Sequence, residues 1–135
     1  MSVEKIAHIG IAVESIEKWI SFYRDVLGLE YTGSEDVPEQ KVRVAFLTIG
    51  ESSIELLEPT SEDSPIAKFL ETRGSGIHHI AIQVDDIEAA LARHHDAGAR
   101  LIDNEPRIGA HDMKIAFIHP KTSGGVLIEL CQPSH

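Results

Sequence analysis

The chain contains the same short strand pattern twice. Residues 8–13 read His-Ile-Gly-Ile-Ala-Val, and residues 79–84 read His-Ile-Ala-Ile-Gln-Val. In both segments, branched apolar residues alternate with histidine, small or polar residues, which is typical of a strand with one face buried. Each histidine therefore begins a face of small residues, and the branched face can hold a helix. Because side chains alternate along a strand, we expect His78 to point away from His79.

The repeat extends beyond these two strands. Residues 43–46 and 114–117 match at a spacing of 71 (43 to 114), which is also the spacing of His8 and His79. Residues 54–56 and 128–130, Ile-Glu-Leu in both, match at a spacing of 74 (54 to 128). The difference of three residues predicts an insertion in the second-half turn at 121–125.

A duplicated β-α-β-β-β module accounts for this pattern. We expect a single α+β domain over residues 1–135, with module 1 at 1–60, a connecting helix and linker at 61–76, and module 2 at 77–135. Each module is too small to bury its sheet alone, so the two are expected to pair and to enclose a site.

Helix and turn signals divide each module into elements. We expect helices over 16–27, 65–73 and 86–97, short strands over 29–32 and 100–103, longer strands over 42–49 and 52–58 with counterparts at 114–117 and 128–130, polar loops over 33–41 and 104–113, and a linker within 71–76. Ser15 and Ser64 are suited to cap the first two helices, and Asp85 with Glu88 the third. A glycine follows each helix, which favours its termination there.

Four polar residues recur at equivalent positions in the two halves. They are His8 with His79 and Glu55 with Glu129, and both glutamates lie within apolar strands. An inward carboxylate in such a strand is costly unless it is paired or binds a metal. One strand histidine or one glutamate alone would most often be structural, but the matched recurrence of both favours a site. Two imidazoles and two carboxylates suit Zn²⁺, Co²⁺, Mn²⁺, Ni²⁺ or Fe²⁺.

Charge and composition exclude several classes of partner. The net charge of −10 argues against nucleic acid, whose phosphates would be repelled. The single cysteine, Cys131, excludes an internal disulfide and fits a reducing compartment. No apolar run approaches the ~20 residues of a membrane span, and the N-terminus lacks the features of a signal peptide. We therefore expect a cytoplasmic protein without a membrane partner.

The strand repeat and several loop segments together resemble a known family. The segments are Val37–Gln40, Asp63–Leu70, Gly76–Ala81, Glu105–Ala110, His119–Lys121 and Gly124–Leu130. The duplicated module with its His-Ile-Gly-Ile-Ala-Val and Ile-Glu-Leu strands resembles the vicinal oxygen chelate (glyoxalase/dioxygenase) superfamily. Within it, the loop segments resemble the methylmalonyl-CoA epimerase family over almost the whole chain.

The resemblance implies epimerisation of an acyl-CoA, methylmalonyl-CoA, by removal and return of the C2 proton. It implies a divalent metal, Co, Zn, Mn or Ni, held by the four matched residues, acting as a Lewis acid on the thioester and carboxylate oxygens. Two acid/base groups on opposite sides of C2 are needed. Glu129 is favoured as one, and Glu55 or Glu39 as the other. Some family members carry a glutamate where this chain has Val44, so the resemblance does not identify the second group.

Further residues are candidates for binding the substrate. Glu39 and Gln40 lie in the first polar loop, and Arg107, Lys114 and Lys121 near the second-half loops are the expected contacts to the CoA phosphates. Each of these three cations would otherwise be an ordinary surface residue. The resemblance also implies a homodimer.

Three other functions fit the same superfamily. A glyoxalase I, isomerising a glutathione hemithioacetal, would use the same four ligands. An extradiol dioxygenase would use Fe²⁺ with two histidines and one carboxylate, and a fourth protein ligand weighs against it. A non-enzymatic ligand-binding module would have no need for four converging ligands.

Overall fold

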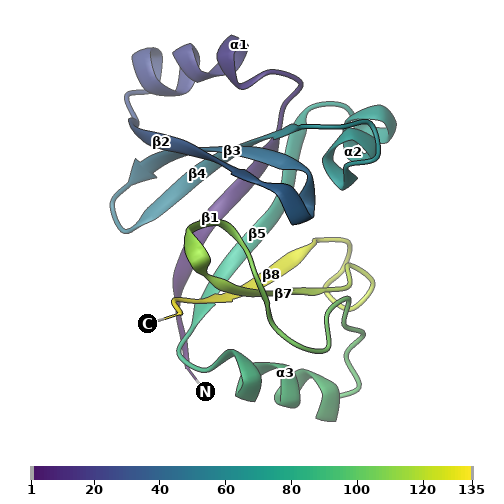
Figure 1. Cartoon of the computed structure of the whole chain (residues 1–135). Helices are drawn as coiled ribbons and strands as arrows, with labels where there is room; N and C mark the ends of the chain where they lie inside the picture. The colour runs from purple at the N-terminus through teal and green to yellow at the C-terminus, as the bar shows by residue number, and fades with distance from the viewer. Residues whose placement is uncertain (1, 135) are drawn as a thin grey trace. The chain divides into compact units, whose positions relative to one another are not determined.

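The computed structural model describes residues 2–134 as strands with short helices between them (Figure 1). In chain order the elements are β1 (Val3–Ala12), α1 (Ile16–Ser21), the π-helical turn η1 (Phe22–Val26), β2 (Glu30–Val37), the 3₁₀ turn η2 (Pro38–Gln40), β3 (Val42–Ile49), β4 (Ser52–Pro59), α2 (Pro65–Arg73), β5 (Gly76–Val84), α3 (Ile87–Asp96), β6 (Arg107–Ile108), the 3₁₀ turn η3 (Ala110–Asp112), β7 (Lys114–Ile118) and β8 (Ile128–Gln132). The order repeats β-α-β-β-β on either side of α2, so the predicted α+β fold class is confirmed.

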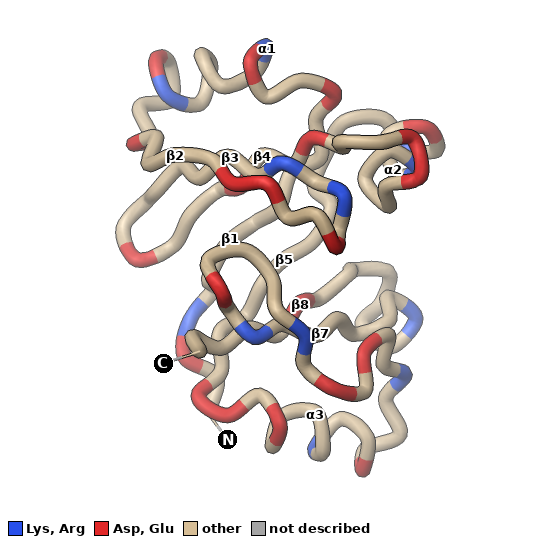
Figure 2. Tube along the Cα trace, viewed as in Figure 1, with Lys and Arg blue, Asp and Glu red and all other residues tan. Residues whose placement is uncertain are grey.

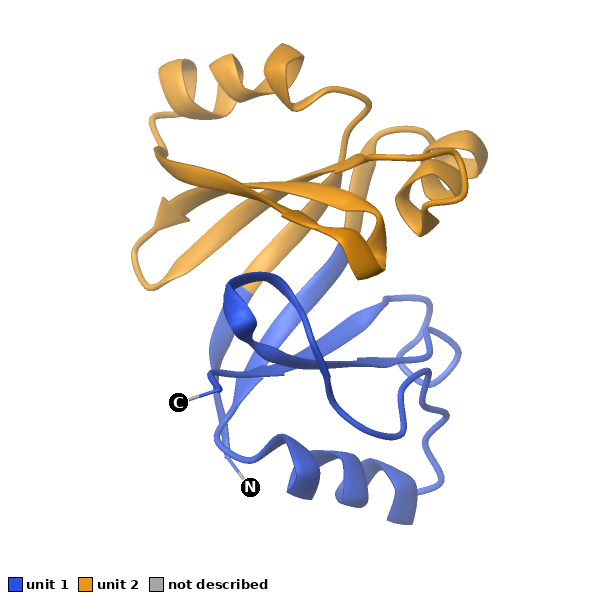
Figure 3. Cartoon of the chain, in the orientation of Figure 1, with its two compact units in different colours: residues 1–7, 79–135 blue, residues 8–78 orange. Residues whose placement is uncertain are grey.

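The chain divides into two compact units, shown in Figure 3. Unit 2 comprises residues 8–78, and unit 1 comprises residues 1–7 with 79–135. The division cuts through β1 and β5, so each of these strands contributes residues to both units. The modules expected at 1–60 and 77–135 stay a prediction.

Unit 2 is a four-stranded sheet covered on one face by the first helix. Its strands follow the order β2-β3-β4-β1, antiparallel except for the parallel β1–β4 pair. Ser15 caps α1, because its side chain accepts a hydrogen bond from the backbone N–H of Lys18. Branched residues on one sheet face pack against this helix to form a core of Val13, Ile16, Ala45, Leu47 and Leu56. The opposite face is left to His8 and Glu55.

Unit 1 repeats this construction. Its strands follow the order β5-β8-β7-β6, with β5 and β8 parallel. The helix α3 packs on one sheet face through a core of Val84, Ile87, Ala90, Leu91, Ala116, Ile118 and Leu130. The opposite face holds a second cluster of Ala81, Ile115, Phe117 and Cys131. His79 and Glu129 lie on this opposite face, because Ala81 and Phe117 are the strand partners of Glu129.

The two units share one strand register around their glutamates. Glu55 is opposite Gly10 in the parallel pair and Phe46 in the antiparallel pair. Glu129 is opposite Ala81 and Phe117 in the same two kinds of pair. Both strand partners on β1 and β5 lie two residues after the histidine. The predicted repeat is therefore confirmed at the level of individual strand pairs.

The predicted insertion is also confirmed. A tight turn through Gly50 and Glu51 joins β3 to β4, whereas residues 119–127 join β7 to β8. The longer connection folds back on itself, with the N–H of Gly125 donating to the carbonyl of Pro120 over 2.7 Å. The three extra residues are thus accommodated without disturbing the strand register.

Some boundaries differ from the sequence-based expectation. Residues 33–37 were expected in a loop but belong to β2, where exposure alternates along the strand. This alternation is concealed in the sequence because two of the inward positions, Gly33 and Glu35, are not apolar. Residues 100–103 form only a single bridge, Leu101 to Ile118, instead of a strand. The predicted loop 104–113 contains the two-residue strand β6 and the turn η3.

The helix ends also need corrections. Asp86, not Asp85, caps α3, and its carboxylate accepts from the N–H of Ala89 over 3.0 Å. Asp85 instead accepts from the N–H of Ser2 over 2.7 Å. The expected helix over 16–27 is α-helical only to Ser21 and continues as a π-helical turn. The expected linker is short, because α2 ends at Arg73 and β5 begins at Gly76.

Acidic residues outnumber basic ones along the chain (red and blue in Figure 2). The chain has 22 aspartates and glutamates against 12 lysines and arginines. Because basic residues are few, a lysine or arginine close to the buried histidines and glutamates is a candidate for binding an anionic ligand. None of the helices formed by residues 2–134 has the length and apolar character needed to cross a membrane.

Candidate functional site

In unit 2 a histidine and a glutamate meet on the sheet face opposite α1. The parallel pairing of β1 with β4 brings His8 Nδ1 to 3.0 Å from Glu55 Oε2. Their side chains are 13% and 11% exposed. Burial lowers the pKa of His8 to about 4. The imidazole is therefore neutral at physiological pH, which is the form that binds metal ions.

In unit 1 the equivalent pair is more deeply buried. His79 Nε2 lies 3.3 Å from Glu129 Oε1, and the two side chains are 6% and 7% exposed. Burial raises the pKa of Glu129 to about 8, and the positive charge of Arg107 acts in the opposite direction. The ring of His79 rests edge-on against Phe117, with 5.7 Å between ring centroids. Both groups are thus held in place by packing as well as by each other.

The donor chemistry of each pair fits a divalent metal. Each unit presents one imidazole nitrogen and one carboxylate oxygen on the same sheet face. Such mixed nitrogen and oxygen donors suit Zn²⁺, Co²⁺, Mn²⁺ or Ni²⁺. A carboxylate as buried as Glu129 is costly to ionise in the absence of a nearby cation, and a bound metal removes that cost.

His78 has different surroundings from its neighbour. Its ring lies edge-on to Phe69 of α2, with 5.0 Å between centroids, and the guanidinium carbon of Arg73 lies over the same phenyl ring, 5.7 Å from its centroid. Burial, followed by the charge of Arg73, lowers the pKa of His78 to about 4. His78 therefore packs against a helix, which agrees with the expectation that it points away from His79.

Arg107 contacts the same phenyl ring as the histidine of the unit 1 pair. Its guanidinium carbon lies 5.5 Å from the centroid of Phe117, the same ring that contacts His79. Its Nε lies 3.4 Å from Asp103 Oδ1, and the other oxygen of Asp103 accepts from the N–H of Phe117 over 2.8 Å. Arg107 is thereby positioned by a carboxylate that is fixed to the strand carrying Phe117.

The two lysines proposed as substrate contacts lie in other environments. Lys114 Nζ is 3.5 Å from Glu88 Oε2 of α3. Strand alternation puts Lys114 on the face of Ala116, which packs on α3, and not on the face of Phe117. Lys121 is exposed in the β7–β8 connection, where its N–H donates to His119 Nδ1 over 3.0 Å. Arg107 is the better supported of the three cations.

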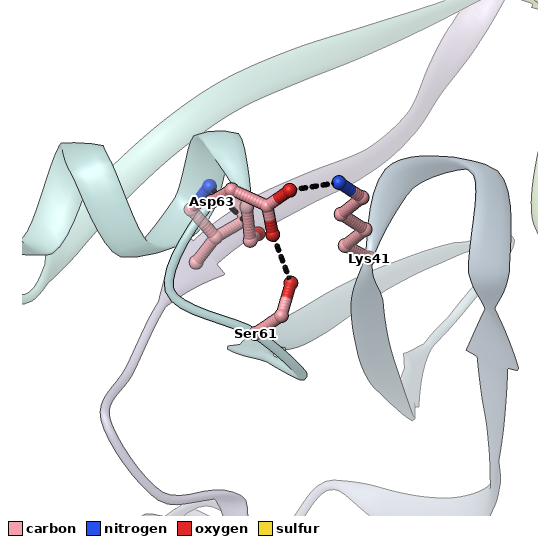
Figure 4. A network of polar contacts seen from close by, with 5 residues as sticks. Lys41, Ser61 and Asp63 are labelled. Carbon is pink, nitrogen blue, oxygen red and sulfur yellow. Dashed lines mark hydrogen bonds and ion pairs between the residues drawn. The ribbon is translucent and has the colours of Figure 1, made fainter.

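The turn that carries Glu39 and Gln40 is anchored at its base (Figure 4). Lys41 follows the turn with a left-handed φ of 53° and pairs with Asp63, which also accepts from Ser61 Oγ over 2.6 Å. The hydrogen bond from Lys41, followed by that from Ser61, lowers the pKa of Asp63 to about 2. Glu39 is exposed and Gln40 is half-buried in the anchored turn.

One residue on the unit 2 site face was missed by the sequence reasoning. Glu35 was assigned to a loop, but it lies on β2 directly opposite Val44. In the structure Gly33, Glu35 and Val37 are the less exposed residues of β2. Only Val37 of the three is apolar, so the sequence shows little hydrophobic alternation along this strand.

Comparison with known proteins identifies close relatives. A sequence profile of the Glyoxalase/Bleomycin resistance protein/Dioxygenase superfamily matches residues 7–117. The ethylmalonyl-CoA/methylmalonyl-CoA epimerase of Cereibacter sphaeroides is 45% identical over 96% of this chain and 98% of its own. A solved structure of a methylmalonyl-CoA epimerase in complex with methylmalonyl-CoA and NH₄⁺ has a TM-score of 0.94 at 42% identity, covering 98% of this chain and 96% of that one.

A relative from another branch is less similar. The probable lactoylglutathione lyase of Vibrio cholerae is 32% identical over 98% of this chain and 93% of its own. The superfamily profile covers most of the chain, and the matched region includes the first His–Glu pair and His79. The chain therefore belongs to the glyoxalase/bleomycin resistance protein/dioxygenase superfamily.

Proposed function

We propose that this chain interconverts the 2R and 2S forms of methylmalonyl-CoA. The observation that carries the proposal is the pair of His–Glu contacts, His8–Glu55 and His79–Glu129, held in the same strand register in the two units. The relatives named as methylmalonyl-CoA epimerases support the choice of substrate, because their identity to this chain extends over nearly its whole length.

His8, Glu55, His79 and Glu129 would together hold one divalent metal ion. Their donor set fits Co, Zn, Mn or Ni, and His8 is already neutral in the metal-free protein. When bound, such an ion supplies Lewis-acid polarisation of the substrate oxygens next to C2.

Glu129 would move the proton at one side of C2. Burial raises its pKa to about 8 in the metal-free protein, and a bound metal would keep the carboxylate ionised, which is the form that accepts a proton. The C2–H bond breaks, the proton passes to a carboxylate oxygen, and a second acid returns a proton to the opposite side. Glu55 and Glu39 are the two candidates for the second group that the sequence offers.

Arg107 would bind an anionic part of the substrate. Its planar guanidinium is oriented by Asp103 and Phe117, which suits contact with a phosphate or carboxylate. Lys121, Glu39 and Gln40 would make further contacts to the acyl-CoA. We do not propose Lys114 as a substrate contact, because its amine is directed to Glu88 on the helix-covered face.

The proposal is tested by assaying the purified protein, after metal analysis, on two substrates. The epimerase function predicts conversion of either enantiomer of methylmalonyl-CoA, with little turnover of the methylglyoxal–glutathione hemithioacetal. A preference for the hemithioacetal would contradict it. Size measurement in solution checks the expected homodimer.

A glyoxalase I is the second candidate, because it would use the same four ligands. The relative named as a probable lactoylglutathione lyase is 32% identical, against 45% for the epimerase relative over a similar share of the chain. The same two-substrate assay decides between the two functions, since the ligand set does not separate them.

A further inference from the structure

Glu35 shares a sheet face with the His8–Glu55 pair. It is directly opposite Val44 in the β2–β3 pairing. The next two inward residues along these strands, Gly33 and Phe46, are also opposite each other, and Phe46 is opposite Glu55 on β4. Directly opposed residues of antiparallel strands project to the same face. Glu35 and Glu55 therefore project from the same face of the unit 2 sheet.

Three buried apolar residues of the adjacent strand share this face with Glu35. Val42, Val44 and Phe46 of the adjacent strand are 3%, 3% and 4% exposed. Glu35 itself is half-buried. A carboxylate beside buried apolar side chains costs free energy that an exposed one does not. Asp36, the next residue, lies on the opposite face, where it accepts from Arg43 Nε over 2.9 Å.

The separation between Glu35 and Glu55 leaves room for a small acyl group. Adjacent strands lie about 4.8 Å apart and alternate residues about 6.8 Å apart. Glu35 and Glu55 are separated by two strand spacings across the sheet and by one two-residue step along it. Their Cα atoms are therefore about 12 Å apart. No heavy atom lies within 4 Å of the position that a Cβ on Gly33 would occupy, so the neighbouring part of the strand is open.

Other carboxylates of unit 2 are less suited to a second proton transfer. Glu55 is engaged with His8 and, in the proposed function, with the metal. Glu30 is exposed at the start of β2, where Thr48 Oγ1 donates to its carboxylate over 3.4 Å. Glu39 is exposed in the turn after β2. Glu35 is the one that is half-buried on the inward face without contributing to the His–Glu pair.

Given the proposed epimerase activity, we infer that Glu35 is the second proton-transfer group and serves the side of C2 opposite the one that Glu129 serves. In one direction Glu129 takes the C2 proton and the carboxylic acid of Glu35 gives a proton to C2. In the other direction the two roles exchange. One C–H bond breaks and one forms, so no oxidant, reductant or co-reactant is required.

The test compares Glu35→Gln with Glu30→Gln, the same change on the same strand and face. In Glu35→Gln we expect epimerisation to fall at least ~10²-fold, the low end for a general acid or base. Exchange of the C2 hydrogen with deuterated solvent should persist from one enantiomer and fail from the other. Metal content and thermal melting should match the unchanged protein, and Glu30→Gln should stay within about twofold in rate, since Glu30 is exposed at the start of β2.

A second variant moves the carboxylate to the adjacent strand. Val44→Glu in the Glu35→Gln background should recover at least about tenfold in rate, because Val44 lies between Glu35 and β4 on the same face. Near-normal epimerisation in metal-loaded Glu35→Gln would overturn the inference, as would equal loss of exchange from both enantiomers. An unchanged protein inactive on methylmalonyl-CoA would instead refute the proposed function.

Discussion

The two units keep the same strand register around their glutamates but differ in the charged residues beside them. In unit 1 the glutamate is opposite Phe117, and Arg107 lies over that ring. In unit 2 the glutamate is opposite Phe46, and the nearby inward charge is the carboxylate of Glu35. The two halves therefore share the His–Glu pair, while the neighbouring charged residue is a cation in one half and a carboxylate in the other.

This difference suits the proposed reaction, in which protons move on both sides of C2 but the anionic part of the substrate is bound on one side only. Inverting one carbon requires proton transfer at two sides, so carboxylates in both halves are useful. Binding an anionic acyl-CoA requires a cation in only one place. Glu129 is also slightly more buried than Glu55, which agrees with the proposed roles of Glu129 as a base and Glu55 mainly as a metal ligand.

The largest expected effect comes from exchanging each glutamate for glutamine. Glu129→Gln should lose at least ~10²-fold in rate while retaining much of its metal, because glutamine keeps an oxygen ligand but loses the basic one. Glu55→Gln should retain its metal and lose less than about tenfold, since its role is to hold metal. Equal losses in the two variants would break the distinction between the halves.

The pH dependence of metal binding sharpens the same comparison. Burial raises the pKa of Glu129 to about 8, so this carboxyl is protonated in the metal-free protein below that pH. Metal binding must release that proton, and affinity should rise about tenfold per pH unit up to pH ~8 and then level off. His8 adds no slope above pH 4, because its pKa is lowered to about 4.

Titration of the metal-free protein with Co²⁺ or Zn²⁺ at several pH values measures this slope. Glu129→Gln serves as the control and should flatten it. An affinity that is constant from pH ~6 to ~8 would show that Glu129 is already ionised before the metal binds.

A smaller effect is expected at the cation of unit 1. Arg107→Met should raise KM for methylmalonyl-CoA about tenfold with kcat little changed, as removal of a charged contact to a bound anion does. Lys114→Met is the matched control on the opposite sheet face and should change KM less than about twofold. Similar KM values in the two variants would remove Arg107 from the substrate contacts.

Much of this architecture could be predicted from the sequence, because the repeat supplied a second copy of each signal. The bounds of β3 were predicted to the residue, and α2 begins after the predicted Ser64 cap. The His–Glu pairs followed from their equivalent positions. These features depend on local patterns that are present in the chain itself.

The remaining features depend on strand register. The place of Glu35 opposite Val44 follows an irregularity between Tyr31 and Gly33, which shifts the pairing of β2 and is not visible in hydropathy. Similarly, Lys114 is a plausible phosphate contact by sequence position, but strand alternation directs it toward α3. A shift of one residue moves a side chain to the other face of a sheet, so such roles require the structure.

In the proposed function the two His–Glu pairs bind one metal ion together. The most direct test of this is the metal stoichiometry of the purified chain and of three histidine variants. We expect one ion per chain, complete loss of that ion in His8→Ala and in His79→Ala, and full retention in His78→Ala. Two ions per chain, or a half-loss in each ligand variant, would show that each unit binds its own metal and would contradict the account.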